Sequence, residues 1–199
     1  MELPDIGLVY CESFPEELVS EFKASLEEFN FKILTETRPD DEAYACAEWF
    51  IPTAVMLFLS KPYVETIMSK LAEDHYDSVK KSFARLTTKT MSKPRIEPVI
   101  MGTPGKLSND NPFSLALSIY AQANDGNTFK LLLPKPSENL DYTKIIYSFL
   151  DFLNNYHSGV KYLSDIGCPE SVRYPSNTIF VHVNTETGKV EWLDATKSM

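Results

Sequence analysis

The stretch EWFIPTAVMLFLSKPY, residues 48–63, is the most apolar part of the sequence and most constrains how the chain can fold. Its predominantly apolar core runs from Trp49 to Leu59 and includes Pro52. A membrane-spanning helix needs about 20 consecutive apolar residues, and the segments on both sides of this core are polar. We therefore expect a buried core element rather than a membrane span.

The pattern of residues 53–60, TAVMLFLS, favours a buried helix over a strand. Ala54, Met56 and Leu57 have high helix propensity, and β-branched residues are few. Pro52 would then kink the helix or begin a second one. The alternative is a buried strand with a proline on each side, because periodicity does not distinguish helix from strand in so short an apolar run.

A β–α–β unit is predicted at the start of the chain. Residues 6–12 (IGLVYCE) and 31–37 (FKILTET) have the composition of short strands. Between them, Ser13 and Glu16 fit a capping box, and the apolar residues that follow recur at helical spacing. A further helix is predicted over residues 62–86, where apolar residues again keep this spacing.

The second half of the chain is predicted to contain hairpins and one long helix. The turn signal NDGN at residues 124–127 joins the predicted strands 113–122 and 128–134. A helix is expected over residues 139–157. Gly188 then suits the turn of a C-terminal hairpin.

The expected fold class is α+β, with a β–α–β unit and a helical pair in the first half and a mostly antiparallel sheet with one covering helix in the second. If residues 53–60 form a strand, the first half becomes a small α/β layer. We expect residues 1–199 to form one compact domain. The segment TTKTMSKP, residues 87–94, is a candidate sub-domain boundary between 1–86 and 95–199, the latter beginning with the predicted strand RIEPVIMG.

Composition narrows the class of protein. Hydrophobic residues make up 43% of the chain, as in an ordinary globular domain. The net charge is −9 and Lys and Arg are not clustered, so we do not expect nucleic-acid binding. Three irregularly spaced cysteines and an N-terminus without the pattern of a secretory signal predict reduced thiols and a cytoplasmic location: Cys11, Cys46 and Cys168.

Three residues are candidates for catalysis. Cys11 and Glu12 end the first predicted strand just before a helix N-terminus, a position that can lower a thiol pKa, and Glu36 ends the second strand. If the two strands are parallel, these residues meet at one edge of the sheet, where α/β enzymes often place their sites. They would belong to a small hydrolase or a nucleotide-processing enzyme. The simpler interpretation is a buried cysteine and two solvated carboxylates.

No metal or cofactor is expected. The three histidines, His75, His157 and His182, are far apart and have no partners at metal-ligand spacing. The segment GTPGK at residues 102–106 is too short for a phosphate-binding loop and lacks the Ser or Thr that follows the lysine in such loops.

The first functional hypothesis is a non-enzymatic protein-interaction domain of the inhibitor, immunity or adaptor type. It is based on the absence of a catalytic motif, on acidity that favours a basic partner, and on the long, weakly patterned segment 158–177. A membrane partner is not expected. The candidate contact residues are acidic or aromatic: Asp40, Asp41, Glu42, Tyr162 and Tyr174.

Overall fold

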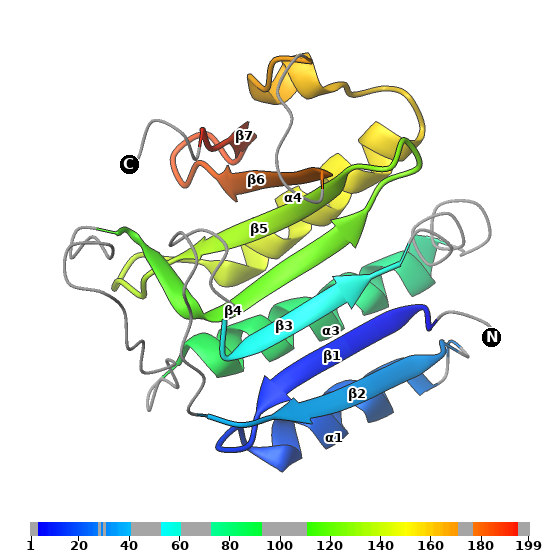
Figure 1. Cartoon of the computed structure of the whole chain (residues 1–199), viewed down its shortest axis with the longest axis vertical. Coiled ribbons are helices and arrows are strands. Elements are labelled where there is room, and N and C mark those ends of the chain that lie inside the picture. Colours follow the sequence, from blue (N-terminus) through cyan, green and yellow to red (C-terminus); the bar gives the residue numbers. More distant parts are fainter. Residues whose placement is uncertain are drawn as a thin grey trace.

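The computed structural model describes residues 4–27, 29, 31–40, 53–60, 73–92, 111–170 and 177–194. In this part of the chain, three α-helices and a short 3-10 helix accompany a seven-stranded mixed sheet, so the fold is mixed α+β as predicted (Figure 1). In chain order the elements are β1 (Ile6–Cys11), α1 (Glu16–Glu27), β2 (Ile33–Arg38), β3 (Val55–Leu59), α3 (Glu73–Met91), β4 (Phe113–Gln122), β5 (Thr128–Pro134), α4 (Tyr142–His157), η2 (Leu163–Ile166), β6 (Thr178–Val183) and β7 (Val190–Trp192).

The sheet is built from three β–α–β units that lie side by side. Its strand order is β2-β1-β3-β4-β5-β6-β7. The pairs β1/β2, β3/β4 and β5/β6 are parallel, and the segment between the two strands of each pair contains α1, α3 or α4. Antiparallel pairing of β1 with β3 and of β4 with β5 joins the units, and β7 adds antiparallel to β6. Parallel neighbours need such crossovers, whereas antiparallel ones need only a turn.

The three helices all lie behind the sheet in the view of Figure 1. Successive strand residues point to opposite faces. Leu8, Leu57 and Ile119, which are at most 1% exposed, belong to the main core cluster together with the apolar residues of the helices. The alternate residues, such as Phe58 and Tyr120, therefore point to the opposite face, which we call the front face.

Several predicted elements are confirmed. The β–α–β unit is present with β1 and β2 parallel, and α1 begins at Glu16. The capping box predicted from Ser13 and Glu16 differs from the structure, because Glu16 is the first residue of α1 and the Ser13 hydroxyl donates a 2.8 Å hydrogen bond to Asp40, which follows β2. Both hairpins form, with Gly126 and Gly188 at positive φ in their turns. The long helix α4 begins after Asp141, whose carboxylate accepts hydrogen bonds from the first helical turn.

The preference for a helix at residues 53–60 is wrong, because Val55–Leu59 form strand β3. This strand lies near the middle of the sheet and pairs with β1 on one side and β4 on the other. Both rows of its backbone groups are thus satisfied by neighbours, and Val55, Leu57 and Leu59 are at most 1% exposed. Pairing with both neighbouring strands overrides the high helix propensity of Ala54 and Met56.

The helix predicted over residues 62–86 is described from Glu73 onward and continues to Met91. Its last turns include residues 87–91 of the candidate boundary, and strands from both sides of that segment belong to one sheet. The strand predicted at 95–102 lies outside the described residues. Across the described part of the chain, none of the helices is both long and apolar enough to cross a membrane.

Candidate functional site

A row of side chains crosses the front face in register. Leu34 of β2 pairs with Gly7 of β1, which pairs with Phe58 of β3, and the row continues through Tyr120 of β4 to Lys130 of β5. The rings of Phe58 and Tyr120 stack with centroids 4.9 Å apart and planes 16° apart. Leu34, on the edge strand β2, is 56% exposed, and Phe58, on β3, is 37% exposed.

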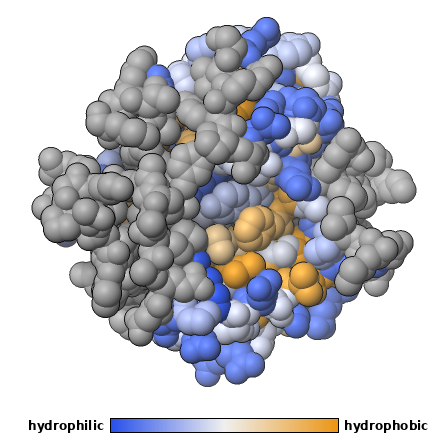
Figure 2. Space-filling model, in the orientation of Figure 1, coloured by the Kyte–Doolittle hydropathy of each residue, from blue (hydrophilic) through white to orange (hydrophobic). Residues whose placement is uncertain are grey.

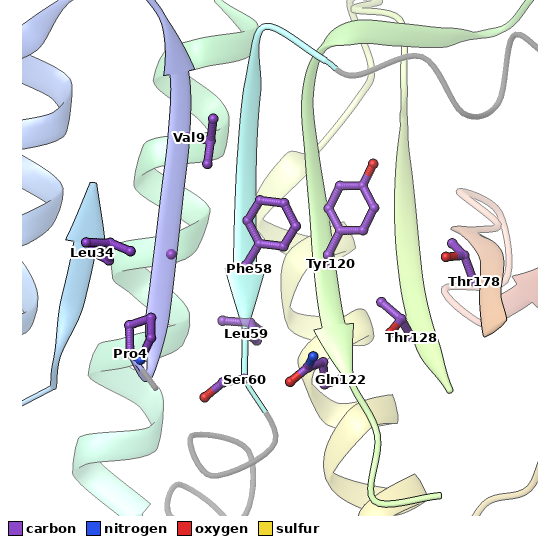
Figure 3. A pocket seen from close by; sticks show the side chains of 11 residues that line it. Pro4, Val9, Leu34, Phe58, Leu59, Ser60, Tyr120, Gln122, Thr128 and Thr178 are labelled. Atoms are coloured by element: carbon purple, nitrogen blue, oxygen red, sulfur yellow. The ribbon is translucent and has the colours of Figure 1, made fainter. Parts of the chain in front are cut away.

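A groove of about 440 Å³ lies over this row. Figure 2 shows hydrophobic side chains gathered in the middle of the front face. The groove has an apolar end near Leu34 and Val9 and a polar, uncharged end near Gln122 and Thr128 (Figure 3). The described residues that line the groove carry no charge: Pro4, Gly7, Val9, Leu34, Phe58, Leu59, Ser60, Tyr120, Gln122, Thr128 and Thr178.

Gly7 is the member of the row that has no side chain, and it lines the groove. Gly7 does not have a positive φ, so its backbone conformation is open to other residues. A Cβ added there would meet Phe58 atoms at 3.4–3.9 Å, which is ordinary van der Waals contact. Glycine inside a strand costs about 0.5–1 kcal/mol relative to alanine. Neither strain nor a clash requires that cost here, and Gly7 and Phe58 both line the groove.

Buried polar groups lie next to Tyr120 of the groove. The Arg38 guanidinium donates to the Thr53 carbonyl, and the Thr53 hydroxyl lies 2.8 Å from that of Ser118. Burial raises the pKa of Tyr120 to about 12, despite opposing effects of its hydrogen bond with Ser118 and of the Arg38 charge. The Tyr120 hydroxyl therefore stays protonated at neutral pH. Lys130 is 2% exposed, with its ammonium 5.3 Å from the centre of the Tyr120 ring.

A second exposed apolar feature is the α4–η2 loop, residues 158–162. Val160 and Tyr162 are 64% and 61% exposed. The amide groups of Val160 and Lys161 donate to the Asn155 carbonyl at 2.8 and 3.0 Å. The Tyr162 amide donates to the Asp165 carboxylate at 2.8 Å. These bonds fix the loop backbone, so little conformational entropy remains to be lost when it binds.

The helix end that carries this loop is attached to the sheet. The Tyr156 hydroxyl donates a 2.6 Å hydrogen bond to Asp125 in the β4–β5 turn. Burial alone would raise the pKa of Asp125, but hydrogen bonds from Tyr156 and Asn127 outweigh it and the pKa is lowered. Burial and the bond to Asp125 raise the pKa of Tyr156. The loop therefore starts from a fixed point, and Gly159 at positive φ turns the chain out of α4.

The three candidate catalytic residues lie near one end of the parallel pair β1/β2. Cys11 is in register with Arg38 and is only 3% exposed. Glu12 and Glu36 are exposed, and Glu36 is in register with Val9. The pairing thus brings Cys11 and Glu36 to the same region, but the thiol is buried. In the part of the chain that the structure describes, no three His, Cys, Asp or Glu side chains are grouped to hold a metal ion.

Among the predicted contact residues, Tyr162 is exposed in the α4–η2 loop. Asp40 is exposed, and its carboxylate accepts hydrogen bonds from the Ser13 amide and hydroxyl. The other three predicted contacts, Asp41, Glu42 and Tyr174, lie outside the described residues.

The groove was not anticipated from the sequence. The described residues that line it come from six strands, β1 to β6, so no local pattern marks it. The one available signal was Gly7 inside an otherwise apolar strand, since such a glycine often marks close approach of another group.

Comparison with known proteins adds no further information: no family model, curated protein or solved structure matches the chain. The chemistry of the exposed surfaces must therefore carry the functional argument.

Proposed function

We propose that this protein is a non-enzymatic, cytoplasmic interaction domain of the inhibitor, immunity or adaptor type, and that it binds another protein through the α4–η2 loop. The observation that carries the proposal is the exposure of Val160 and Tyr162 on a hydrogen-bonded backbone. Burying one such side chain in an interface stabilises a complex by about 1.5–3 kcal/mol relative to leaving it in water.

The geometry of the loop supports a role in protein binding. Tyrosine combines a large apolar ring with a polar tip, and it is among the residues that most often dominate interface energies. The Lys161 ammonium lies 4.0 Å from the Asp165 carboxylate, so both signs of charge are present near Tyr162. Such charges select a partner more than they add affinity.

The acidity of the chain supports a basic partner. The net charge is −9, and Asp40 is one exposed source of it. Long-range attraction would raise the rate of encounter without demanding direct contact. The segment containing Asp40, Asp41 and Glu42 is proposed as a steering element rather than as the contact itself.

The proposal is tested by purifying the tagged protein from its own cells and measuring the masses and stoichiometry of what accompanies it. We expect one stoichiometric protein partner, which Tyr162→Ala releases and Leu34→Ser retains. Leu34 is a matched control because it is also an exposed apolar residue but lies in the groove. Recovery of the protein alone would contradict the proposal. So would retention of the partner by both Tyr162→Ala and Val160→Ser at the level of the wild type.

A second candidate function is a small hydrolase or nucleotide-processing enzyme that uses Cys11, Glu12 and Glu36. The parallel pairing of β1 and β2 favours it, because it brings Cys11 and Glu36 near the same end of the sheet. Rapid reaction of Cys11 with iodoacetamide at neutral pH would support this function, as a nucleophilic thiolate requires. Since Cys11 is 3% exposed, we expect labelling only after denaturation, which would remove it as a nucleophile.

A further inference from the structure

We propose that the groove on the front face is a binding site for a small, flat, uncharged aromatic molecule that carries a hydrogen-bonding group at one end. This site is separate from the α4–η2 loop, and the inference does not depend on the identity of a protein partner. It rests on the size of the groove, the slot at Gly7, the absence of charged side chains among the described lining residues and the polarity of one end.

The size of the groove fits a small molecule. Its volume of about 440 Å³ lies within the range of about 300–1,000 Å³ that is usual for small-molecule sites. Most of its described lining is apolar or aromatic, with a few hydroxyl and amide groups, and this is the usual composition of such sites.

The slot beside Phe58 favours a flat ring. One neighbour of Phe58 in the row is Tyr120, which stacks on it with an interplanar angle of 16°. Its other neighbour in the row is Gly7, where the nearest atoms to an added Cβ belong to Phe58 itself. An aromatic ring placed over Gly7 would meet Phe58 and Leu34 and would extend the existing aromatic contact in an offset arrangement.

The described lining residues favour a neutral ligand. None of the described lining residues is charged, although the chain as a whole carries −9. An ion that entered would lose hydration without gaining an opposite charge from these residues, which is costly. Lys130, the next residue of the row, is 2% exposed and packs against the rings of Tyr120 and Phe180.

The polar end determines the orientation of the ligand. Thr128 and Thr178 are register partners on β5 and β6, and Gln122 pairs with Thr128 from β4. Figure 3 shows these three side chains together at one end of the groove, with Leu34 and Val9 at the other. A carbonyl or hydroxyl group on the ligand would lie at this end, while its rings occupy the slot at Gly7.

Isothermal titration calorimetry of the full chain at pH 7 with two matched probes tests this inference. The probes are 2-acetylnaphthalene, which is neutral, and 2-naphthoate, which has the same rings and a negative charge. We expect saturable 1:1 binding of 2-acetylnaphthalene, and binding of 2-naphthoate that is weaker by at least about tenfold. Absence of saturable heat with the neutral probe would overturn the site, and equal affinity for both would overturn its neutral ligand class.

Two groove variants locate the binding. Gly7→Val fills the slot with a residue that strands favour, and the affinity for 2-acetylnaphthalene should fall by at least about tenfold. Thr128→Val removes a hydroxyl at the polar end with little change of volume, and it should weaken binding severalfold. If Gly7→Val does not fold, Thr128→Val alone shows whether the probe binds in the groove. Val160→Ser, in the α4–η2 loop, is the control and should bind like the wild type.

Wild-type affinity in both folded groove variants would overturn the assignment to this groove. The result is independent of the protein-interaction proposal, because loss of the protein partner is tested by Tyr162→Ala and loss of the probe by Gly7→Val. The experiments can therefore contradict one proposal and support the other.

Discussion

The groove and the α4–η2 loop both expose large apolar side chains, but they expose them differently. Leu34 and Phe58 lie on a sheet, in a hollow bounded by side chains of neighbouring strands. Val160 and Tyr162 lie on a short loop beyond the end of a helix and are more exposed, at 64% and 61%. Strand pairing fixes the positions of Leu34 and Phe58, whereas hydrogen bonds within the loop fix those of Val160 and Tyr162.

This difference shows why the two sites suit different ligands. A recessed ring such as Phe58 is covered most completely by something small enough to enter the hollow. An exposed ring such as that of Tyr162 is covered most completely by the surface of another protein, which also excludes water around it. The same residue class therefore supports two functions according to the shape of the backbone that carries it.

The largest effect is expected at Tyr162. Tyr162→Ala should lower the affinity for the protein partner by about 2 kcal/mol, because a truncated interface anchor loses its buried contacts. Titration calorimetry with the purified partner measures it, and the affinity for 2-acetylnaphthalene should not change. A loss shared by both ligands would mean that the two sites are one.

The attachment of α4 to the β4–β5 turn should matter next. Tyr156→Phe removes the hydrogen bond to Asp125 and should lower the free energy of unfolding at pH 7 by about 1 kcal/mol, a value reduced for the exposure of the carboxylate. Urea titration of both proteins measures it.

The same pair predicts a pH dependence. The folded-state pKa of Asp125 is lowered, so its contribution is fully present above the unfolded-state pKa, near 3.8, and is lost as the pH falls through the lower folded-state pKa. The difference between the wild type and Tyr156→Phe should therefore shrink at acid pH. A constant difference across this range would show that the ionised carboxylate is not the partner that matters.

The slot at Gly7 should show a small stability effect of opposite sign. Gly7→Val should raise the free energy of unfolding by about 0.5 kcal/mol, because valine loses less backbone freedom and packs well in a strand. Urea titration measures the change. A gain in stability together with a loss of probe binding would indicate that the glycine is retained for binding. A marked loss of stability would instead show that the slot is needed for packing.

The smallest effect is expected at Asp40. Asp40→Asn keeps an oxygen that can accept from Ser13 but removes the charge, so it separates the hydrogen bonds from the electrostatics. The association rate with a basic partner should fall by about twofold at low ionic strength and should be unchanged at high salt. Stopped-flow association kinetics measure it. An unchanged rate at low salt would remove Asp40 from the steering element.

The α4–η2 loop could be partly predicted from the sequence, whereas the groove could not. The helix that ends at His157, the turn at Gly159 and the exposed position of Tyr162 depend on neighbours within a few residues. The groove depends on the register of neighbouring strands, which brings Leu34, Phe58 and Tyr120 into one row. Local patterns do not contain that information.

The same contrast explains the error at β3. Ala54 and Met56 favour a helix locally, and only pairing with β1 and β4 makes the segment a strand. Phe58 belongs to β3, so a prediction that makes residues 53–60 a helix does not place Phe58 in the groove. The repeated β–α–β architecture is likewise visible only in the strand order, since the three units share no repeated sequence.

The most direct test of two distinct sites uses glycines as reporters. Gly7 lies in the groove, whereas Gly159 and Gly167 lie on either side of residues 160–166. In ¹H–¹⁵N correlation spectra of the full chain, 2-acetylnaphthalene should shift the amide signal of Gly7 and leave those of Gly159 and Gly167 in place. Shifts at Gly159 and Gly167 with Gly7 unmoved, or no shift at any of the three, would contradict the account.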